Sequence, residues 1–343
     1  MSSKTCTLCG SPRADHFTKT DAKDTRKTLS LMTCLDCSLV QQADIPAPEV
    51  LRAYYSHHYR TDYKSTYTPK ARHVYRAGRA ALDRLAFLRP MLGQRVAPEC
   101  IDIGAGGGEF VYLANRMNIR ARGIEPNIGY SAFARDAYDV TIDTADIDAL
   151  QKDSADIVTM FHVLEHLPDP EAALRRIHAA LRPGGLLLIE VPNILQKDAS
   201  PHNIYFGAHL FYFSLETLRA LASPWFELVK ADSKGNVFAL FRRRDTQAPR
   251  ALPSALDTQL ALARLKKKGW VEYLTEGGAP MRLGRRIAQR FTEMRFRHQA
   301  PRQILDQLFD TLPPLARPQA TPRKWLPWAA AAVMIALTLE ALC

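Results

Sequence analysis

Cys100-Ile101-Asp102-Ile103-Gly104-Ala105-Gly106-Gly107-Gly108-Glu109-Phe110 is the stretch that decides the fold. Apolar residues lead into an acid and then into glycines at alternating positions, and apolar residues at helical spacing follow as far as Met117. A buried parallel strand that ends in a glycine turn and opens a helix has this pattern. Glycine suits such a turn because the backbone is tight and passes close to a ligand. A dinucleotide fingerprint looks similar, so the downstream elements must separate the two classes.

Four further apolar runs follow at the spacing of alternating strands and helices. These runs are residues 121–124, 140–142, 155–160 and 186–191. Polar residues follow the first three of them, namely Glu125, Asp146 and, after Phe161, His162, with Glu165-His166 three residues on. This order of motifs resembles the class I S-adenosylmethionine (SAM) dependent methyltransferases over about residues 98 to 243. The resemblance implies an α/β enzyme with a Rossmann-like sheet of seven strands and SAM as its cofactor.

The resemblance and the side-chain chemistry together predict a cofactor site. We expect Gly104, Gly106 and Gly108 to bring backbone N–H groups and a helix N-terminus toward the carboxylate of SAM. Glu125 stands at a strand end, where its carboxylate can accept both ribose hydroxyls. Asp146 can accept a hydrogen bond from the adenine amino group, although helix capping is a competing role for it. The other expected cofactor contacts are Asp102, Ile147 and Phe161.

Histidines near the same sheet edge are candidates for a general base. Ligands of open α/β sheets bind at the carboxyl ends of the strands, which places His162 near the methionine end of SAM. His166 is a second candidate, with helix entry, packing or metal contact as alternatives. Tyr205 and His209 match the Tyr and His of the sugar C-methyltransferases, but Ala208 stands where that family has Glu. We therefore favour O-methylation over C-methylation, and packing remains an alternative for His209.

Two Cys-x-x-Cys pairs near the start of the chain predict a metal site. The cysteines are Cys6, Cys9, Cys34 and Cys37, and 24 residues separate the pairs. Two such turns complete a tetrahedron of thiolates around one zinc ion, with no position open for water, so the zinc is expected to be structural. A redox pair is the alternative. We find no secretory signal, which favours metal over disulfides. An N-terminal zinc ribbon followed by Tyr54-Tyr55-Ser56-His57-His58-Tyr59 and the glycine turn resembles the zinc-containing methyltransferases of bacterial sugar pathways.

The positive charge is concentrated in the C-terminal part of this 343-residue chain. Between Arg242 and Lys324 there are 18 Lys or Arg against 7 Asp or Glu, an excess that equals the net charge of +11. The final residues, 325–343, are apolar and about long enough to span hydrocarbon. We expect a membrane anchor there, with an interfacial helix or an oligomerising helix as alternatives. The basic stretch would then face an anionic membrane surface, placing the protein in the cytoplasm at the inner face of the membrane.

The sequence thus predicts five parts, which are a zinc ribbon (1–42), an aromatic connector with cap helices (43–97), a SAM-binding core (98–243), a basic helical tail with a Pro-rich linker (244–324) and the C-terminal anchor (325–343). The favoured activity is O-methylation of a sugar or lipid-linked glycan intermediate. The alternatives are methylation of a nucleic acid, sugar C-methylation and a membrane-tethered SAM-binding scaffold. Nucleic acid is the weaker partner because the zinc ribbon, with its thiolates and zinc counted, is close to neutral.

Overall fold

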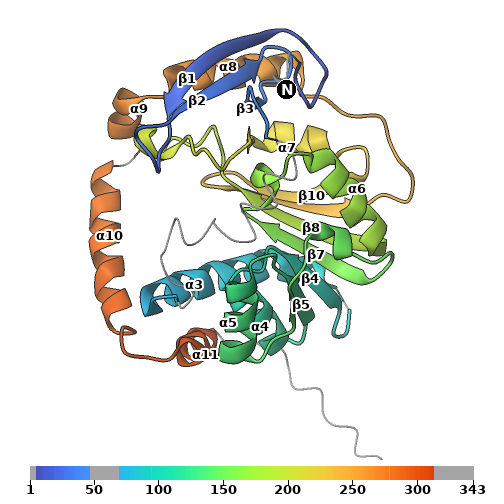
Figure 1. Ribbon diagram of the computed structural model, residues 1–343, viewed down its shortest axis with the longest axis vertical. Helices are drawn as coiled ribbons and strands as arrows, with labels where there is room; N and C mark the ends of the chain where they lie inside the picture. The colour runs from blue at the N-terminus through green and yellow to red at the C-terminus, as the bar shows by residue number, and fades with distance from the viewer. Residues whose placement is uncertain (1–4, 47–68, 94, 278, 313–343) are drawn as a thin grey trace, which may run out of the picture. The chain divides into compact units, whose positions relative to one another are not determined.

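A sheet of seven strands occupies the centre of the fold, in the order β10-β11-β8-β7-β4-β5-β6 (Figure 1). The computed structural model describes residues 5–46, 69–93, 95–277 and 279–312. The strands are β4 (Glu99–Ile103), β5 (Arg120–Ile124), β6 (Ile142–Asp143), β7 (Ala155–Phe161), β8 (Leu181–Val191), β10 (Phe226–Asp232) and β11 (Val237–Arg243). Strands β4 to β8 pair in parallel, and β11 pairs antiparallel with β8 and β10. The predicted α/β fold is confirmed.

Helices cover both faces of this sheet, which explains why its central strands are continuous apolar runs rather than alternating ones. In Figure 1, α3 (Ala71–Leu88), α4 (Glu109–Arg116) and α5 (Ile128–Tyr138) lie on one side, and α6 (Pro170–Ala180) and α7 (Leu215–Ala222) lie on the other. The amphipathic helix predicted for residues 70–90 is α3. It buries Val74, Ala81, Leu85 and Leu88.

The strand order reverses at β4, which positions the site. β5 lies on one side of β4 and β7 on the other. The loops after β4 and β7 therefore leave toward opposite faces and open a crevice at the carboxyl edge, where open α/β sheets bind ligands. The glycine turn follows β4, and His162 follows β7.

The N-terminal segment forms a second sheet that includes a strand of the core. Its order is β1 (Ala14–Thr20), β2 (Thr28–Cys34), β3 (Val40–Gln42) and β9 (Phe211–Tyr212). The short strands expected around Phe17 and Leu31 are present, and these two residues face each other across β1 and β2. β9 belongs to the loop after β8, and it pairs antiparallel with β3. Through β9, this loop pairs with the edge strand β3, whose backbone groups would otherwise be unpaired.

The basic tail folds into four helices that belong to the same compact unit, which extends to Thr311. They are α8 (Ala255–Lys267), α9 (Trp270–Thr275), α10 (Ala279–Met294) and α11 (Pro301–Asp310). α11 packs against α3 and buries Ile304, Leu305, Leu308 and Phe309. The ribbon, the core and these helices are therefore parts of one unit.

No helix of the described residues is long and apolar enough to cross a membrane. The expected anchor at 325–343, the Pro-rich linker after residue 312 and the aromatic run at 54–59 all lie outside the described residues.

Candidate functional site

The glycine turn after β4 is shaped by the packing of neighbouring loops. Gly104, Gly106 and Gly108 have φ angles of 71°, 54° and 83°, in the left-handed region that favours glycine. A Cβ on Gly104 would lie 2.4 Å from Cγ2 of Val163, in the loop after β7. A Cβ on Gly108 would lie 2.8 Å from the Cβ of Ala134 in α5. Glycine is therefore required here because neighbouring segments of the same chain pack closely against the turn, as well as by the backbone conformation of the turn itself.

The backbone N–H groups of the same glycines all donate hydrogen bonds within the protein. Gly104 donates to the carbonyl oxygen of Ile124, Gly108 to that of Ala105, and Gly106 to the Glu125 carboxylate at 2.8 Å. In this structure the three N–H groups donate to acceptors within the protein, and binding of the SAM carboxylate at this turn stays a prediction. The sequence shows where the turn lies, but hydrogen-bond partners depend on how β5 sits beside it.

Glu125 lies at the carboxyl end of β5 beside the glycine turn, as the sequence predicted. Its Oε1 accepts from the N–H of Asn127 at 3.0 Å, and its Oε2 accepts from Gly106. These two bonds fix the carboxylate at the rim of the crevice. A carboxylate has about four acceptor positions, so Glu125 in this orientation has the capacity to accept ribose hydroxyls as well.

The other expected cofactor residues divide into exposed and buried ones. Asp146 is exposed and accepts from the N–H of Asp148 at 2.9 Å, so it caps a short helix, and Ile147 is half-buried beside it. Asp102 is buried, and it accepts from the Thr159 hydroxyl at 2.6 Å; burial raises the pKa of Asp102 to about 7. Phe161 is also buried. Asp146 and Ile147 thus lie in the segment after β6, whereas Asp102 links β4 to β7.

His162 is held between two carboxylates at the end of β7. Its Nε2 lies 3.1 Å from Oε1 of Glu190, and its Nδ1 lies 3.5 Å from Oε1 of Glu165. Burial disfavours the charged ring, but the hydrogen bonds and charges of the two carboxylates prevail and raise the pKa of His162 to about 9. Since a charged imidazole has no nitrogen that can accept a proton, His162 is poorly suited to be the base at neutral pH.

Glu190 completes this arrangement and was not predicted. Arg84 of α3 donates to its Oε2 at 2.7 Å, and Asn236 donates to its Oε1 at 2.6 Å. Burial opposes ionisation, but His162 and Arg84 outweigh it and hold the pKa of Glu190 at about 2. The feature of the sequence that could have identified Glu190 is that it is a lone acid within the apolar run of β8.

His166 and His209 form a pair further along the carboxyl edge of the sheet. Nδ1 of His166 is 2.8 Å from the carbonyl oxygen of Ala208, which can only accept, so Nδ1 carries the proton. The His166 and His209 rings are in edge contact, with centroids 4.8 Å apart. Burial and the charge of His166 lower the pKa of His209 to about 3, so His209 is neutral at pH 7. The structure thus places His166 and His209 in direct contact, and Glu165 links them to His162, whose Nδ1 lies 3.5 Å from Oε1 of Glu165.

Glu165 lies against both histidines and was named in the sequence only as a neighbour of His166. Its side chain is 1% exposed, and its Oε1 lies 3.5 Å from Nδ1 of His162 and 4.0 Å from Nε2 of His166. The charges of the surrounding histidines keep its pKa low despite burial. Ligand atoms of Glu165, His166 and His209 all lie within 4.8 Å of one another, so this group could also hold a metal ion.

A cavity of about 260 Å³ opens beside His209. Its lining combines amide, hydroxyl and apolar groups with one ammonium: Pro192, Asn193, Ile194, Gln196, Ala199, Asn203, Ile204, Phe206, His209, Tyr212 and Lys268. The predicted Tyr205 is not among these residues; it packs edge-on against Phe17 and Tyr212, and burial raises its pKa to about 12. Sequence reasoning missed Asn193, Tyr212 and Lys268, whose spacing along the chain carries no common signal.

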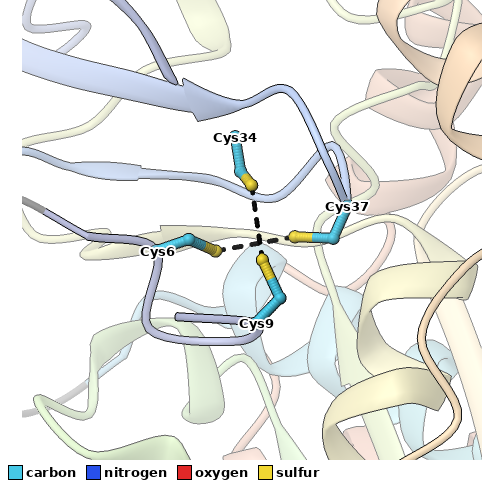
Figure 2. A group of neighbouring side chains, drawn as sticks. All are labelled: Cys6, Cys9, Cys34 and Cys37. Carbon is cyan, nitrogen blue, oxygen red and sulfur yellow. Dashed lines mark hydrogen bonds between the residues drawn. The ribbon is translucent and has the colours of Figure 1, made fainter. Parts of the chain in front are cut away.

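The four cysteines of the ribbon form the cluster that their spacing predicted. Figure 2 shows their sulfurs pointing toward one another, and Sγ–Sγ distances are 3.5 Å for Cys6–Cys37 and for Cys9–Cys34. A tetrahedral zinc site with Zn–S bonds of about 2.3 Å has sulfurs roughly 3.8 Å apart, so the spacing fits. Gly10 and Ser38, each directly after the second cysteine of a pair, both have positive φ (73° and 61°). The two turns therefore share one conformation.

Comparison with known proteins agrees with this geometry. A family model described as a methyltransferase domain matches residues 71–223. The ubiquinone biosynthesis O-methyltransferase of Rhizobium etli is 34% identical over 119 residues, which are 33% of this chain and 46% of that protein. That of Albidiferax ferrireducens is 27% identical over 135 residues, 34% of this chain and 48% of that protein. The chain thus spans about half the length of these relatives.

Among solved structures, the 1,6-didemethyltoxoflavin-N1-methyltransferase of Burkholderia thailandensis, with bound S-adenosylhomocysteine, is 20% identical; the TM-score is 0.45, and 61% of this chain and 97% of that one are covered. The family match covers the glycine turn, Glu125 and the histidine cluster. The chain therefore contains a methyltransferase domain over residues 71–223.

Proposed function

We propose that this protein transfers the methyl group of SAM to a hydroxyl oxygen of a sugar or glycan intermediate. The observation that carries the proposal is the cavity beside His209. Asn193, Gln196 and Asn203, which carry side-chain amides, are among the residues that line it, together with Tyr212. Side-chain amides both donate and accept, which suits the hydroxyl groups of a sugar. The O-methyltransferase names of the Rhizobium and Albidiferax relatives support oxygen as the acceptor atom.

In this proposal the cofactor lies over the glycine turn, with Glu125 on its ribose and Asp146 and Ile147 near the adenine. SAM supplies an electrophilic methyl group, so the protein has to align the acceptor and remove its proton. Alignment alone contributes several kcal/mol to lowering such a barrier. The rigid backbone around Glu125 and the closeness of the two loops at Gly104 and Val163 serve this alignment.

His209 is the base that the geometry favours. It lines the cavity, and burial keeps its imidazole neutral at pH 7, so one ring nitrogen can accept a hydrogen bond from the acceptor hydroxyl. When the acceptor oxygen bonds to the methyl carbon, the sulfur keeps the electrons of the broken bond and the hydroxyl proton passes to His209. The negative charge of Glu165 stabilises the cationic ring that forms, because Glu165 is buried and raises the pKa of His209. His166 orients the ring through its edge contact.

The proposal assigns zinc to the cysteine cluster as a structural ion. Four thiolates complete the coordination of the metal, so no position is open for the acceptor. The ribbon instead contributes through β3, which carries the loop of His209.

Methyl transfer from radiolabelled SAM to a panel of sugars, sugar phosphates and nucleotide sugars tests the proposal. We expect at least one of these to become labelled and His209→Ala to lower turnover roughly 10²–10⁴-fold, since that is the usual contribution of a general base. Binding of S-adenosylhomocysteine should be unchanged. His16→Ala, on the exposed face of β1, is the control.

Two outcomes would redirect the proposal. Labelling of phenols but of no carbohydrate would replace the sugar by an aromatic acceptor. Full activity in His209→Ala, with a large loss in His166→Ala, would move the base to the neighbouring ring.

A further inference from the structure

The run Lys266-Lys267-Lys268 at the end of α8 is divided by the fold. Lys266 and Lys267 are exposed, whereas Lys268 is half-buried and lines the cavity beside His209. The sequence placed all three in a basic tail that would face a membrane. The structure separates one of them from the solvent-facing face of the helix, and no sequence pattern marks which one.

Lys268 is held in place from the core side. Its Nζ donates to the carbonyl oxygen of Gln196 at 2.6 Å, and Arg264, one turn earlier in α8, donates to the carbonyl oxygen of Leu195. Gln196 itself lines the cavity, so the ammonium lies at the cavity wall. An ammonium has three donors, and the Gln196 carbonyl takes one of them.

Among the described residues that line the cavity, Lys268 is a cation and none is an acid. Among the described residues, no carboxylate forms an ion pair with Lys268; the nearby Glu272 pairs with Arg264, and Glu276 pairs with Lys197. Burial, and then the positive charge of Arg264, lower the pKa of Lys268 to about 8. A cation that is half-buried against a cavity wall, with no carboxylate beside it, can attract an anion into that cavity.

We propose that Lys268 binds an anionic oxygen group, a phosphate or a carboxylate, on the acceptor molecule in this cavity. That the bound molecule is the methyl acceptor rests on the proposed function, but anion binding at Lys268 can be measured without turnover. Lys268 and the proposed base His209 line the same cavity, so the anionic group and the methylated hydroxyl belong to one small molecule. The acceptor class is then a sugar phosphate, a nucleotide-linked or lipid-linked sugar, or a uronic acid.

Acylation of lysines in the full-length protein measures the anion site directly. Inorganic phosphate should slow the acylation of Lys268 about tenfold when it saturates, as read by mass spectrometry of the peptides, and should leave Lys267 unchanged. Equal protection of the two lysines, or none at Lys268, would overturn the proposal, because a diffuse basic surface does not discriminate between neighbours.

Calorimetry in the presence of S-adenosylhomocysteine then identifies the group, with glucose 1-phosphate, glucuronate and glucose as probes. Binding of one charged probe should weaken at least about tenfold in Lys268→Gln, as expected for a lost charge-assisted hydrogen bond. It should persist in Lys268→Arg and be unchanged in Lys267→Gln. The glutamine amide can still donate to Gln196, so the loop keeps its contact, and the melting temperature checks the fold.

The two proposals fail in different ways. Protection of Lys268 by phosphate with no methylation of any carbohydrate keeps the anion site and rejects the sugar acceptor. Methylation of an uncharged sugar at equal rates in Lys268→Gln and in the unmodified protein, without protection by phosphate, keeps the methyltransferase proposal and rejects the anion site.

Discussion

The side-chain amide of Gln42 donates to the backbone carbonyl oxygen of His209 at 2.8 Å and to that of Gly207 at 2.9 Å. Its backbone N–H donates to Leu210 at 2.8 Å. Gln42 is the last residue of β3, so the N-terminal sheet holds the loop that carries the proposed base. The segment with the cysteine cluster therefore also positions part of the candidate site.

Gln42→Ala should therefore affect the acceptor side of the site. Removing both donors frees the loop at Gly207 and His209, and a displacement near the base costs up to about 10²-fold in rate. We expect turnover to fall about tenfold to hundredfold, with the dissociation constant of S-adenosylhomocysteine within about twofold. The control is Gln41→Ala, because Gln41 instead accepts from Thr7 inside the ribbon. Equal effects of the two variants on turnover would contradict a specific role for Gln42.

Glu125→Ala should weaken binding of S-adenosylhomocysteine by about 1–3 kcal/mol, because ribose hydroxyls donate strong hydrogen bonds to a carboxylate. Calorimetry measures this directly. Glu99→Ala removes a carboxylate from the exposed start of β4, where it pairs with Arg120, and should leave binding unchanged. If Glu125→Ala binds as tightly as the unmodified protein, the ribose does not sit at this carboxylate.

Elemental analysis should find about one zinc per chain, and Cys34→Ser should lose it. Loss of a structural zinc ligand removes folding free energy, so this variant should also unfold at lower temperature. Cys100→Ser is a matched control, because Cys100 is buried in β4, away from the cluster. Zinc that persists in Cys34→Ser but leaves in His166→Ala would place the ion at the histidine group instead.

The pairing of His162 with Glu190 predicts a pH dependence of stability. The pKa of His162 rises from 6.5 to about 9 on folding, so the stability that its charge contributes is fully present below pH 6.5 and is lost as the pH rises through about 9. The difference in melting temperature between the unmodified protein and His162→Gln should therefore shrink as the pH rises from about 6.5 to about 9 and stay small above that. His16→Gln is the control. A difference that stays constant across this range would mean that the ring is neutral in the folded protein.

The sequence by itself determined the order of the elements. Glycines at 104, 106 and 108 after an apolar run, and acids or histidines after the next runs, were enough to predict the parallel sheet and its carboxyl edge. Local patterns carry this information because strand burial, tight turns and helix starts each restrict residue type within a few positions. The Cys-x-x-Cys spacing predicted the cysteine cluster for the same reason.

Only the tertiary structure decided which side chains meet. Gln42 and His209 are far apart in the chain, and so are Arg84 and Glu190, so no periodicity relates them. The charge state of each histidine depends on such contacts: two carboxylates hold the charge on His162, whereas burial beside His166 keeps His209 neutral. Lys267 and Lys268 are identical neighbours in sequence, and the direction in which each leaves the end of α8 decides that one meets solvent and the other a cavity.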